Sequence, residues 1–213
     1  MNNNIPLPAI TRLCSVYQFL LSLEKDGQKR ISSSELERRL GISAHSVRKD
    51  ISYLGIAGGI GAGYEVSRLK ELIGERFGFA EQKKACLVGL GRLGSAILQR
   101  SSFPGGEFRV IAGFDSNINK LETIKTTVSV FPAYQITEMV RALGITLGII
   151  AVPAASLQEV AGRLIDGGVR GIVNFAPGLI NPTVEGVFIR NMDMMAELRI
   201  LSAQVRVRDE INT

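Results

Sequence analysis

A glycine-rich segment in the middle of the chain has the residue types and spacing that bind a dinucleotide. The pattern GxGxxG, at residues 89–94, directly follows the short apolar run 85–88 and precedes a helical run. A second apolar run, 109–114, ends in Asp115, about 20 residues beyond the last glycine. A strand, a glycine loop, a helix and a second strand with a terminal acid form the fingerprint of a Rossmann nucleotide-binding unit.

Each part of this fingerprint has a physical task. Gly89 permits the tight turn, Gly91 lets the backbone approach a pyrophosphate, and Gly94 lets helix and strand pack closely. The helix N-terminus stabilises the phosphate charge. Asp115 can accept hydrogen bonds from both ribose hydroxyls and would repel a 2′-phosphate, so the pattern predicts NAD(H) rather than NADP(H). The expected cofactor-binding loop consists of Gly89, Leu90, Gly91, Arg92, Leu93 and Gly94.

Two further apolar runs, 147–152 and 171–175, lead into loops that contain proline. In a parallel sheet the loops at the carboxyl ends of the strands meet at one edge, where the nicotinamide ring is expected. We therefore expect further cofactor contacts from these loops, at Val152, Pro153, Asn174, Phe175 and Ala176.

The same region lacks the groups that hydride transfer to a substrate needs. His45, the only histidine, lies in the first half of the chain, and the lysines of the second half lie away from the two proline-containing loops. Only about 130 residues remain for this domain, which leaves no substrate domain. We expect a protein that binds NAD(H) without reacting it, and not an enzyme. The enzymatic alternative is a minimal NAD-dependent oxidoreductase that takes its acid or base from a partner chain.

Before residue 78 the apolar residues recur at helical spacing, which predicts a small helical domain. Residues 9–25 fit one helix. Its apolar face would consist of Ile10, Leu13, Tyr17, Leu20 and Leu21. A capping box from Ser32 to Glu35 predicts the start of a second helix, which ends at Gly41.

Ser43 is the expected N-cap of a third helix, 44–54, and the two short helices with their glycine turn predict a helix-turn-helix. The exposed face of the third helix would suit base edges and phosphates in a major groove. This face consists of Ala44, His45, Ser46, Arg48, Lys49 and Ser52. The glycine-rich segment 55–66 then suits the wing of a winged helix. A solvated helix face that binds no DNA is the plainer alternative.

Composition limits the other possibilities. The chain has 213 residues and a net charge of +5, which allows one large domain or two small ones. One histidine and two cysteines cannot supply four His or Cys ligands to a zinc ion, so no metal is expected. Two thiols without repeated spacing, the lack of an apolar run of about 18 residues and the absence of a signal peptide predict a cytoplasmic protein without membrane contact.

A winged helix joined to a small NAD-binding Rossmann domain resembles the Rex family of redox-sensing transcriptional repressors. The resemblance covers nearly the whole chain. In the first half it rests on the motifs at residues 33–36, 47–55 and 61–64. In the second half it rests on those at residues 89–94, 114–115, 152–153 and 171–177.

This resemblance implies an α/β chain of three segments. They are a winged-helix DNA-binding domain, 1–78, a Rossmann NAD(H)-binding domain, 79–190, and a C-terminal dimerisation helix and tail, 191–213. The change in sequence pattern near residues 74–84 separately predicts a linker at residues 78–84. The resemblance implies a homodimer that binds palindromic operator DNA when NADH is low and releases it when NADH binds, repressing fermentative and respiratory genes. The implied DNA contacts are His45, Ser46, Arg48, Lys49 and Tyr53. The C-terminal helix, about 192–203, would be exchanged between subunits through a stripe of Met195, Leu198 and Leu201.

Several positions depart from the family's pattern. Gly59 and Ile60 stand where family wings carry a basic residue, which should weaken minor-groove or phosphate binding. Asp193 matches the acid of the family's redox switch, but its arginine and tyrosine partners correspond here to Gln18 and Arg100. We hypothesise that Arg100 pairs with Asp193 and biases the dimer toward one state. A Rex-like NAD(H)-binding paralogue with weakened DNA binding or altered switching is therefore the alternative.

Overall fold

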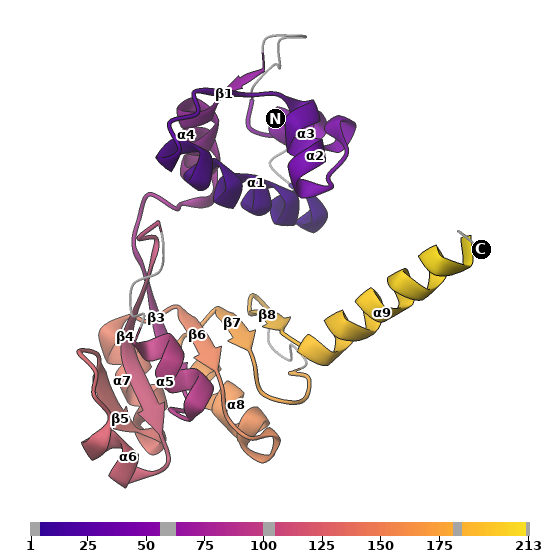
Figure 1. Cartoon of the computed structure of the whole chain (residues 1–213). Coiled ribbons are helices and arrows are strands. Elements are labelled where there is room, and N and C mark those ends of the chain that lie inside the picture. The colour runs from indigo at the N-terminus through magenta and orange to yellow at the C-terminus, as the bar shows by residue number, and fades with distance from the viewer. Residues whose placement is uncertain (1–4, 56–62, 100–104, 181–184, 212–213) are drawn as a thin grey trace. The chain divides into compact units, whose positions relative to one another are not determined.

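The computed structural model describes residues 5–55, 63–99, 105–180 and 185–211 (Figure 1). The chain divides into two compact units, Met1–Glu81 and Gln82–Thr213. The first unit has one apolar core, and the second has a core on each face of its sheet. The separation of residues 191–213 as a dimerisation segment stays a prediction.

The described part of the first unit contains four helices and a two-stranded ribbon. The helices are α1 (Leu7–Lys25), α2 (Ser33–Leu40), α3 (Ala44–Ser52) and α4 (Val66–Phe77), and the antiparallel strands are β1 (Arg30–Ile31) and β2 (Tyr64–Glu65). Helix α1 packs on both α3 and α4, and α2 packs on α3. Buried aliphatic side chains fill the space between them, among them Leu13, Leu20, Leu36, Ile51 and Leu69.

The predicted caps of the two short helices are confirmed. Ser32 Oγ accepts a hydrogen bond from the Glu35 amide at 3.0 Å, and Ser43 Oγ accepts one from the Ser46 amide at 3.2 Å. Each hydroxyl thus satisfies an amide that a helix start leaves without a partner. Gly41 ends α2 with a φ of 68°, in the left-handed region that favours glycine.

Some local expectations are wrong. The Glu35 carboxylate does not close the capping box but accepts a hydrogen bond from Gln28 Nε2 at 3.2 Å. Helix α3 ends at Ser52 rather than at residue 54. Of the expected apolar face of α1, Leu13 and Leu20 are buried, whereas the rest of the buried face consists of Ala9, Val16 and Leu23, because several helices pack around α1.

Strand β2 is the described end of the expected wing. It pairs with β1, which places Tyr64 opposite Ile31 and ties the wing to the segment before α2. Residues 56–62, which include the expected wing positions Gly59 and Ile60, lie outside the described residues.

The second unit is built on a sheet of six parallel strands in the order β5-β4-β3-β6-β7-β8 (Figure 1). The strands are β3 (Lys83–Val88), β4 (Phe108–Asp115), β5 (Ser129–Pro132), β6 (Leu147–Ile150), β7 (Gly171–Asn174) and β8 (Phe188–Asn191). From β3 the chain builds the sheet first to one side and then, from β6, to the other. Ligands of open α/β sheets bind beyond the carboxyl ends of the strands at such a switch point.

Helices cover both faces of this sheet. One face packs against α5 (Arg92–Leu98) and α6 (Ile118–Thr123), and the other packs against α7 (Ile136–Leu143) and α8 (Leu157–Gly167). Two short 3-10 turns, Ala133–Gln135 and Ala154–Ser156, precede α7 and α8. Along β3, Ala85 and Leu87 face one core while Cys86 and Val88 face the other. Burial on both faces explains the uninterrupted apolar runs of the central strands, and the predicted α/β class is confirmed.

The edges of the unit differ from expectation. Strand β3 begins at Lys83, so the end of the expected linker 78–84 belongs to the sheet. The sequence pattern does not predict strands β5 and β8, because both lie at the edges of the sheet. Strand β8 exposes Phe188 and so lacks a buried apolar run. The C-terminal helix is longer than expected, since α9 runs over Met194–Ile211, and nearly all its described side chains are exposed.

Candidate dinucleotide site and nucleic-acid interface

A cavity of about 840 Å³ opens at the carboxyl ends of the strands in the second unit. The residues that follow β3, β4, β6 and β7 line it, at the switch point of the sheet. Its volume lies in the range of small-molecule sites. Of the residues expected to bind the cofactor, the lining includes Gly89, Gly91, Leu93, Asp115, Val152, Pro153 and Phe175.

The three fingerprint glycines occupy different surroundings. Gly89 has a φ of 95°, and a Cβ there would collide with the Ala151 carbonyl oxygen. A Cβ on Gly94 would overlap the Gly89 carbonyl oxygen, because α5 packs directly on the loop. At Gly91, in contrast, no described atom outside its chain neighbours and helix backbone lies within 4 Å of where a Cβ would stand. Gly89 and Gly94 thus shape the loop, while Gly91 leaves open space beside the backbone in the cavity wall.

Asp115 is held by the loop that it faces. The residue ends β4 and is 6 % exposed. Its Oδ2 accepts a hydrogen bond from the Leu90 amide at 2.8 Å, and its Oδ1 accepts one from the Asn117 amide at 2.8 Å. Lys120 Nζ lies 3.3 Å from Oδ2 and forms an ion pair. The carboxylate is therefore fixed at the cavity wall, with a cation beside it that partly balances its charge.

Asn174 fixes the loop that follows β7. Its side chain is fully buried, and its Oδ1 accepts a hydrogen bond from the Ala176 amide at 2.9 Å. Its Nδ2 donates to the Gly178 carbonyl and to Asn191 Oδ1, each at 2.9 Å. These bonds shape the loop from behind, and Phe175 forms part of the cavity wall in front.

The remaining expected residues lie beside the wall. Leu90 is buried and contributes its backbone amide, whereas Arg92 is exposed at the start of α5. The lining also contains residues that sequence reasoning missed, among them Lys120, Tyr134, Glu159 and Arg163. Among these, Lys120 has a detectable signal, a cation shortly after the fingerprint acid. Tyr134, Glu159 and Arg163 have no such signal in the sequence, because only the order of the strands brings their segments to the cavity.

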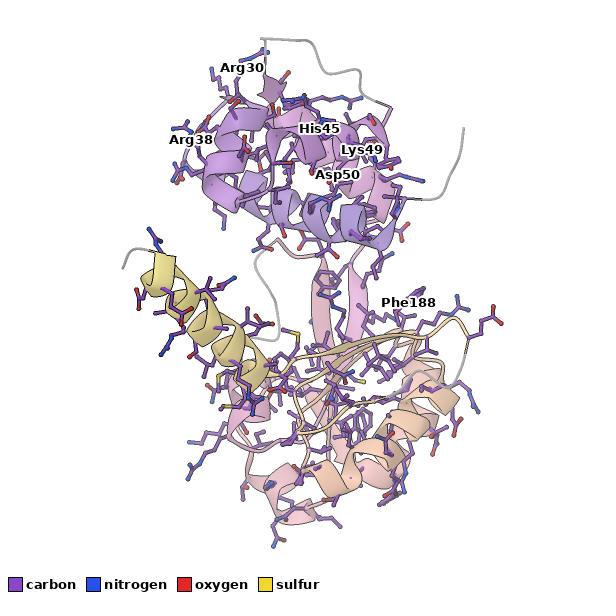
Figure 2. All side chains as sticks on the ribbon, turned by 90° about the vertical axis from the view of Figure 1, so that its right-hand side faces the viewer. Arg30, Arg38, His45, Lys49, Asp50 and Phe188 are labelled. Atoms are coloured by element: carbon purple, nitrogen blue, oxygen red, sulfur yellow. The ribbon has the colours of Figure 1, made fainter. Side chains whose placement is uncertain are left out.

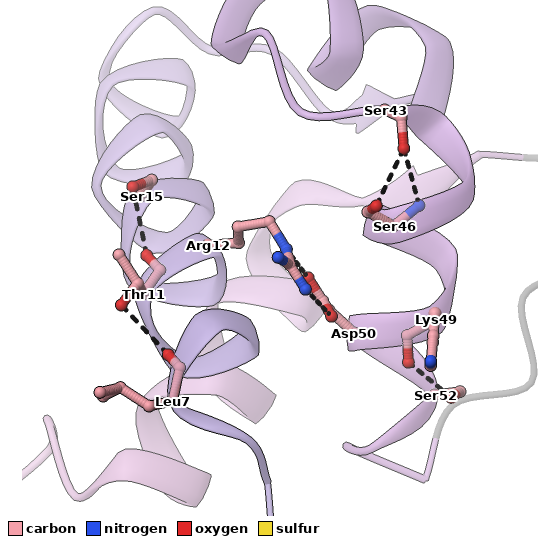
Figure 3. A network of polar contacts seen from close by, with 9 residues as sticks. All are labelled: Leu7, Thr11, Arg12, Ser15, Ser43, Ser46, Lys49, Asp50 and Ser52. Atoms are coloured by element: carbon pink, nitrogen blue, oxygen red, sulfur yellow. Dashed lines mark hydrogen bonds and ion pairs between the residues drawn. The ribbon is translucent and has the colours of Figure 1, made fainter.

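In the first unit, α3 presents a polar and cationic face (Figure 2). His45, Arg48 and Lys49 are exposed, whereas Ser46 and Tyr53 are half-buried. The Ser43 hydroxyl donates to Ser46 Oγ at 2.9 Å, so the Ser46 side chain belongs to the N-cap of its own helix (Figure 3). The best-placed side chains for a ligand are therefore those of His45, Arg48 and Lys49.

Arg48 connects this face with the two neighbouring elements. Its Nη1 donates to Ser33 Oγ at 3.0 Å, at the start of α2. Burial raises the pKa of Tyr64 on β2, and the positive charge of Arg48 opposes that rise. Arg48 thus lies close to both the first turn of α2 and the described end of the wing.

A partly buried ion pair sets the position of α3 on α1 (Figure 3). Arg12 Nε lies 2.6 Å from Asp50 Oδ2, and Arg12 Nη2 donates to Asp50 Oδ1 at 2.9 Å. The hydrogen bond to Asp50 raises the pKa of Arg12 above its ordinary value. Asp50 lies on the inward face of α3, so this pair orients the outward face that carries Lys49.

The expected switch residues are placed as follows. Asp193 directly precedes α9, and its Oδ1 accepts hydrogen bonds from the amides of Met195 at 2.9 Å and Ala196 at 3.1 Å. It therefore caps that helix. Gln18 is exposed on α1, and Arg100 lies outside the described residues. The pairing of Arg100 with Asp193 stays a prediction.

Other chemistries find little support in the described ranges. No group of three or more His, Cys, Asp or Glu side chains there is arranged to hold a metal ion. Burial raises the pKa of both thiols, that of Cys86 to about 12, so neither is a ready thiolate. Among the helices of the described ranges, none has the length and apolar character needed to cross a membrane.

Two family models match the chain. The one described as "Putative DNA-binding protein N-terminus" matches residues 4–52, which span α1 to α3. The one described as "CoA binding domain" matches residues 80–178, from β3 to the loop after β7.

Curated relatives match over nearly their full length. The redox-sensing transcriptional repressor Rex 1 of Thermotoga maritima is 37 % identical over 206 residues, which are 96 % of this chain and 98 % of that protein. The redox-sensing transcriptional repressor Rex of Carboxydothermus hydrogenoformans is 34 % identical over 202 residues, 95 % and 97 % of the two chains.

Solved structures also match this chain over nearly its full length. The crystal structure of RSP, a Rex-family repressor, has a TM-score of 0.84 and 27 % identity, and the match covers 98 % of this chain and 97 % of that chain. RSP in complex with β-NAD+ and operator DNA matches with a TM-score of 0.84 and 27 % identity over 98 % and 96 % of the chains. RSP in complex with β-NADH matches with a TM-score of 0.83 and 26 % identity over 98 % and 97 %.

Proposed function

The chain belongs to the Rex family of redox-sensing transcriptional repressors, and on that basis we propose that it is a repressor whose DNA binding responds to the balance of NADH and NAD+. The observation that carries the proposal is one chain with two sites. The first is a cavity with Asp115 beside a GxGxxG loop, and the second is a helix-turn-helix whose α3 exposes Arg48 and Lys49. The proposed compartment is the cytoplasm, where operator DNA and NAD(H) meet.

The residues of the cavity fit NAD(H) better than NADP(H) or coenzyme A. The Asp115 carboxylate can accept hydrogen bonds from an unmodified ribose, whereas a phosphate on that ribose would bring a second negative charge against it. NADP(H) carries such a phosphate at the 2′ position and coenzyme A at the 3′ position. Gly91 would let the pyrophosphate approach the first turn of α5. Val152, Pro153 and Phe175 would enclose the nicotinamide end.

The DNA interface is proposed to centre on α3. Arg48 can pair with guanine through two hydrogen bonds, and Lys49 can neutralise a phosphate. His45 lies at the exposed start of the same helix, and Ser46 and Tyr53 flank the face. The partly buried pair of Arg12 with Asp50 would hold this face in position.

A second copy of the chain is the proposed partner of α9. Exposed apolar side chains follow α9 along its length, each at least 50 % exposed, at Met194, Met195, Leu198, Ile200, Leu201, Val205 and Val207. An apolar surface of this extent is typical of an interface. Exchange of α9 between two subunits would bury it in a homodimer.

The proposal assigns no catalysed reaction to the cavity. Its described lining contains no histidine or cysteine, and Glu159 is paired with Arg163 at 2.6 Å. Asp115 is likewise engaged with Lys120 and two backbone amides. Turnover of NADH with a carbonyl substrate would instead support the alternative of a minimal oxidoreductase.

Fluorescence anisotropy of a labelled palindromic operator duplex tests the proposal. The chain is titrated at fixed salt without nucleotide and with NADH, NAD+ or coenzyme A. Weakening of DNA binding by NADH of tenfold or more, about 1.4 kcal/mol, supports a redox-responsive repressor. DNA binding that is weak, salt-sensitive and indifferent to sequence would instead indicate a paralogue with weakened DNA recognition.

A family member with altered switching is the second candidate, and Gln18 favours it because a neutral side chain replaces the family's arginine there. In this case Arg100 pairs with Asp193 and holds the dimer in one state. NADH would then bind the cavity but shift the operator affinity by less than about tenfold. A larger NADH-dependent shift in operator affinity would refute the proposal that this pairing holds the dimer in one state.

A further inference from the structure

A series of hydrogen bonds leads from the cavity wall toward α9. Asn174 immediately precedes Phe175, which lines the cavity. Asn174 Nδ2 donates a hydrogen bond to Asn191 Oδ1 at 2.9 Å. The same Asn191 oxygen accepts a hydrogen bond from the Ile180 amide at 3.1 Å, and Asn191 Nδ2 donates to the Ile180 carbonyl at 3.4 Å. The backbone adds a further bond, from the Met192 amide to the Asn174 carbonyl at 2.8 Å.

The two ends of this series lie at functionally different places. At one end, Phe175 and Pro177 belong to the wall of the cavity. At the other end, Asn191 stands two residues before Asp193, which caps the first turn of α9. Asn191 itself is not among the described residues that line the cavity, so its connection to a bound ligand runs through Asn174.

Burial makes the Asn174 end of this connection stiff, whereas Asn191 itself is exposed. Asn174 is fully buried, and both polar atoms of its side chain are bonded. A shift of the loop that left this amide without partners would be costly, so a displaced loop favours movement of Asn191 with it. The described side chains of α9 are almost all exposed, so within its own chain the residues before it set the direction of this helix.

We propose that Asn191 is a positioning residue that links the loop 175–180 to α9, so that a dinucleotide in the cavity changes the setting of that helix. The inference rests on the proposed function, because it takes the ligand of the cavity to be NAD(H). It adds a residue outside both the fingerprint and the expected switch positions.

Substitutions of Asn191 can separate this role from a merely structural one. Asn191→Ala removes the acceptor for Asn174 and Ile180, while Asn174 keeps its bonds to Gly178 and Ala176, so the cavity wall is retained. Asn191→Asp keeps an acceptor oxygen for both donors and is the conservative variant. Asn191→Val removes the same bonds with a side chain suited to strands, should alanine weaken β8. Arg190→Ala, at the exposed neighbouring position of β8, is the matched control.

The experiment compares full-length chains by hydrogen–deuterium exchange with and without saturating NADH, beside NADH affinity from calorimetry. We expect NADH to change exchange over residues 194–211 in the wild type. Asn191→Ala should bind NADH within about threefold of wild type yet lose about half or more of that change. Asn191→Asp and Arg190→Ala should retain the NADH-dependent change in exchange over residues 194–211.

Two results would overturn the proposal. One is a full NADH-dependent change in Asn191→Ala and Asn191→Val, and the other is no change at α9 in a wild type that binds NADH. Failure of the NAD(H) site that the inference takes from the proposed function is distinguishable, since the wild type would then show no NADH binding by calorimetry.

Discussion

Replacing Arg12 by methionine tests the contact that sets the DNA-binding helix on its scaffold. Two guanidinium nitrogens of Arg12 contact the two carboxylate oxygens of Asp50, at 2.6 and 2.9 Å. Methionine keeps an unbranched apolar stem but removes both donors. Because Asp50 is only 2 % exposed, its carboxylate then stays buried without a cation.

Burial on each side of the pair decides the size of the effect. Removing one partner of a fully buried pair costs about 3–5 kcal/mol, whereas an exposed pair contributes about 0–1 kcal/mol. The Arg12 side chain is 34 % exposed, so solvent screens the pair in part. We therefore expect Arg12→Met to lower the free energy of unfolding of the first unit by about 2–3 kcal/mol. For a unit of this size, that corresponds to a fall in Tm of about 10–20 °C.

The aromatic residues allow the first unit to be followed in the intact chain. There is no tryptophan, and of the four tyrosines all but Tyr134 lie in the first unit. Melting is therefore followed by near-ultraviolet circular dichroism of tyrosine. Lys70→Met is the matched control, because Lys70 binds Glu24 at 2.7 and 2.8 Å in a more exposed ion pair between α4 and α1. It should cost less than about 1 kcal/mol.

The double variant Arg12→Met with Asp50→Leu completes the test. It should regain most of the lost stability, because an apolar pair leaves no charge buried. Operator affinity should fall in Arg12→Met and recover in the double variant. A loss below about 1 kcal/mol in Arg12→Met, or a double variant less stable than the single one, would refute the argument that Asp50 depends on its cation.

Substitutions of the fingerprint glycines should have separable effects: Gly91→Ala should melt like wild type but bind NADH about tenfold or more weakly, whereas Gly94→Ala should lose both stability and binding, since its Cβ overlaps the Gly89 carbonyl. Calorimetry measures the NADH affinity of each variant, and thermal melting measures its stability. Equal affinity and equal stability of the two variants would contradict this prediction. Lys49→Met should weaken binding to every DNA sequence and reduce the slope of log affinity against log salt by about one, while an unchanged slope would place Lys49 away from phosphate. Burial raises the pKa of Cys86 to about 12, so the unfolded thiol releases its proton at lower pH than the folded one. The stability of the second unit should therefore fall as pH rises from about 9 toward 12. Denaturant titrations over this pH range measure the stability of wild type and of Cys86→Ala. Identical dependence of stability on pH in the two proteins would exclude the Cys86 thiol as the cause of the fall.

The local features of the fold could be predicted because a few neighbouring residues decide them. Ser32 and Ser43 cap helices through amides three residues away, and Gly41 ends α2 because its φ of 68° favours glycine. The edge strands could not be predicted, since β8 owes its existence to its neighbour β7 rather than to a buried apolar run. The buried face of α1 likewise depends on the helices that pack against it.

The candidate sites divide in the same way. The GxGxxG loop with Asp115, and the cationic face around Arg48, are visible in the residues alone, because turn geometry, helix periodicity and charge are properties of short segments. The contacts that hold these sites in place are not. Asn174 meets Asn191 only after β7 and β8 pair, and Arg12 meets Asp50 only after α1 packs on α3. Such pairs have no characteristic spacing in sequence. Strand order and helix packing bring them together, and burial then makes their polar bonds obligatory.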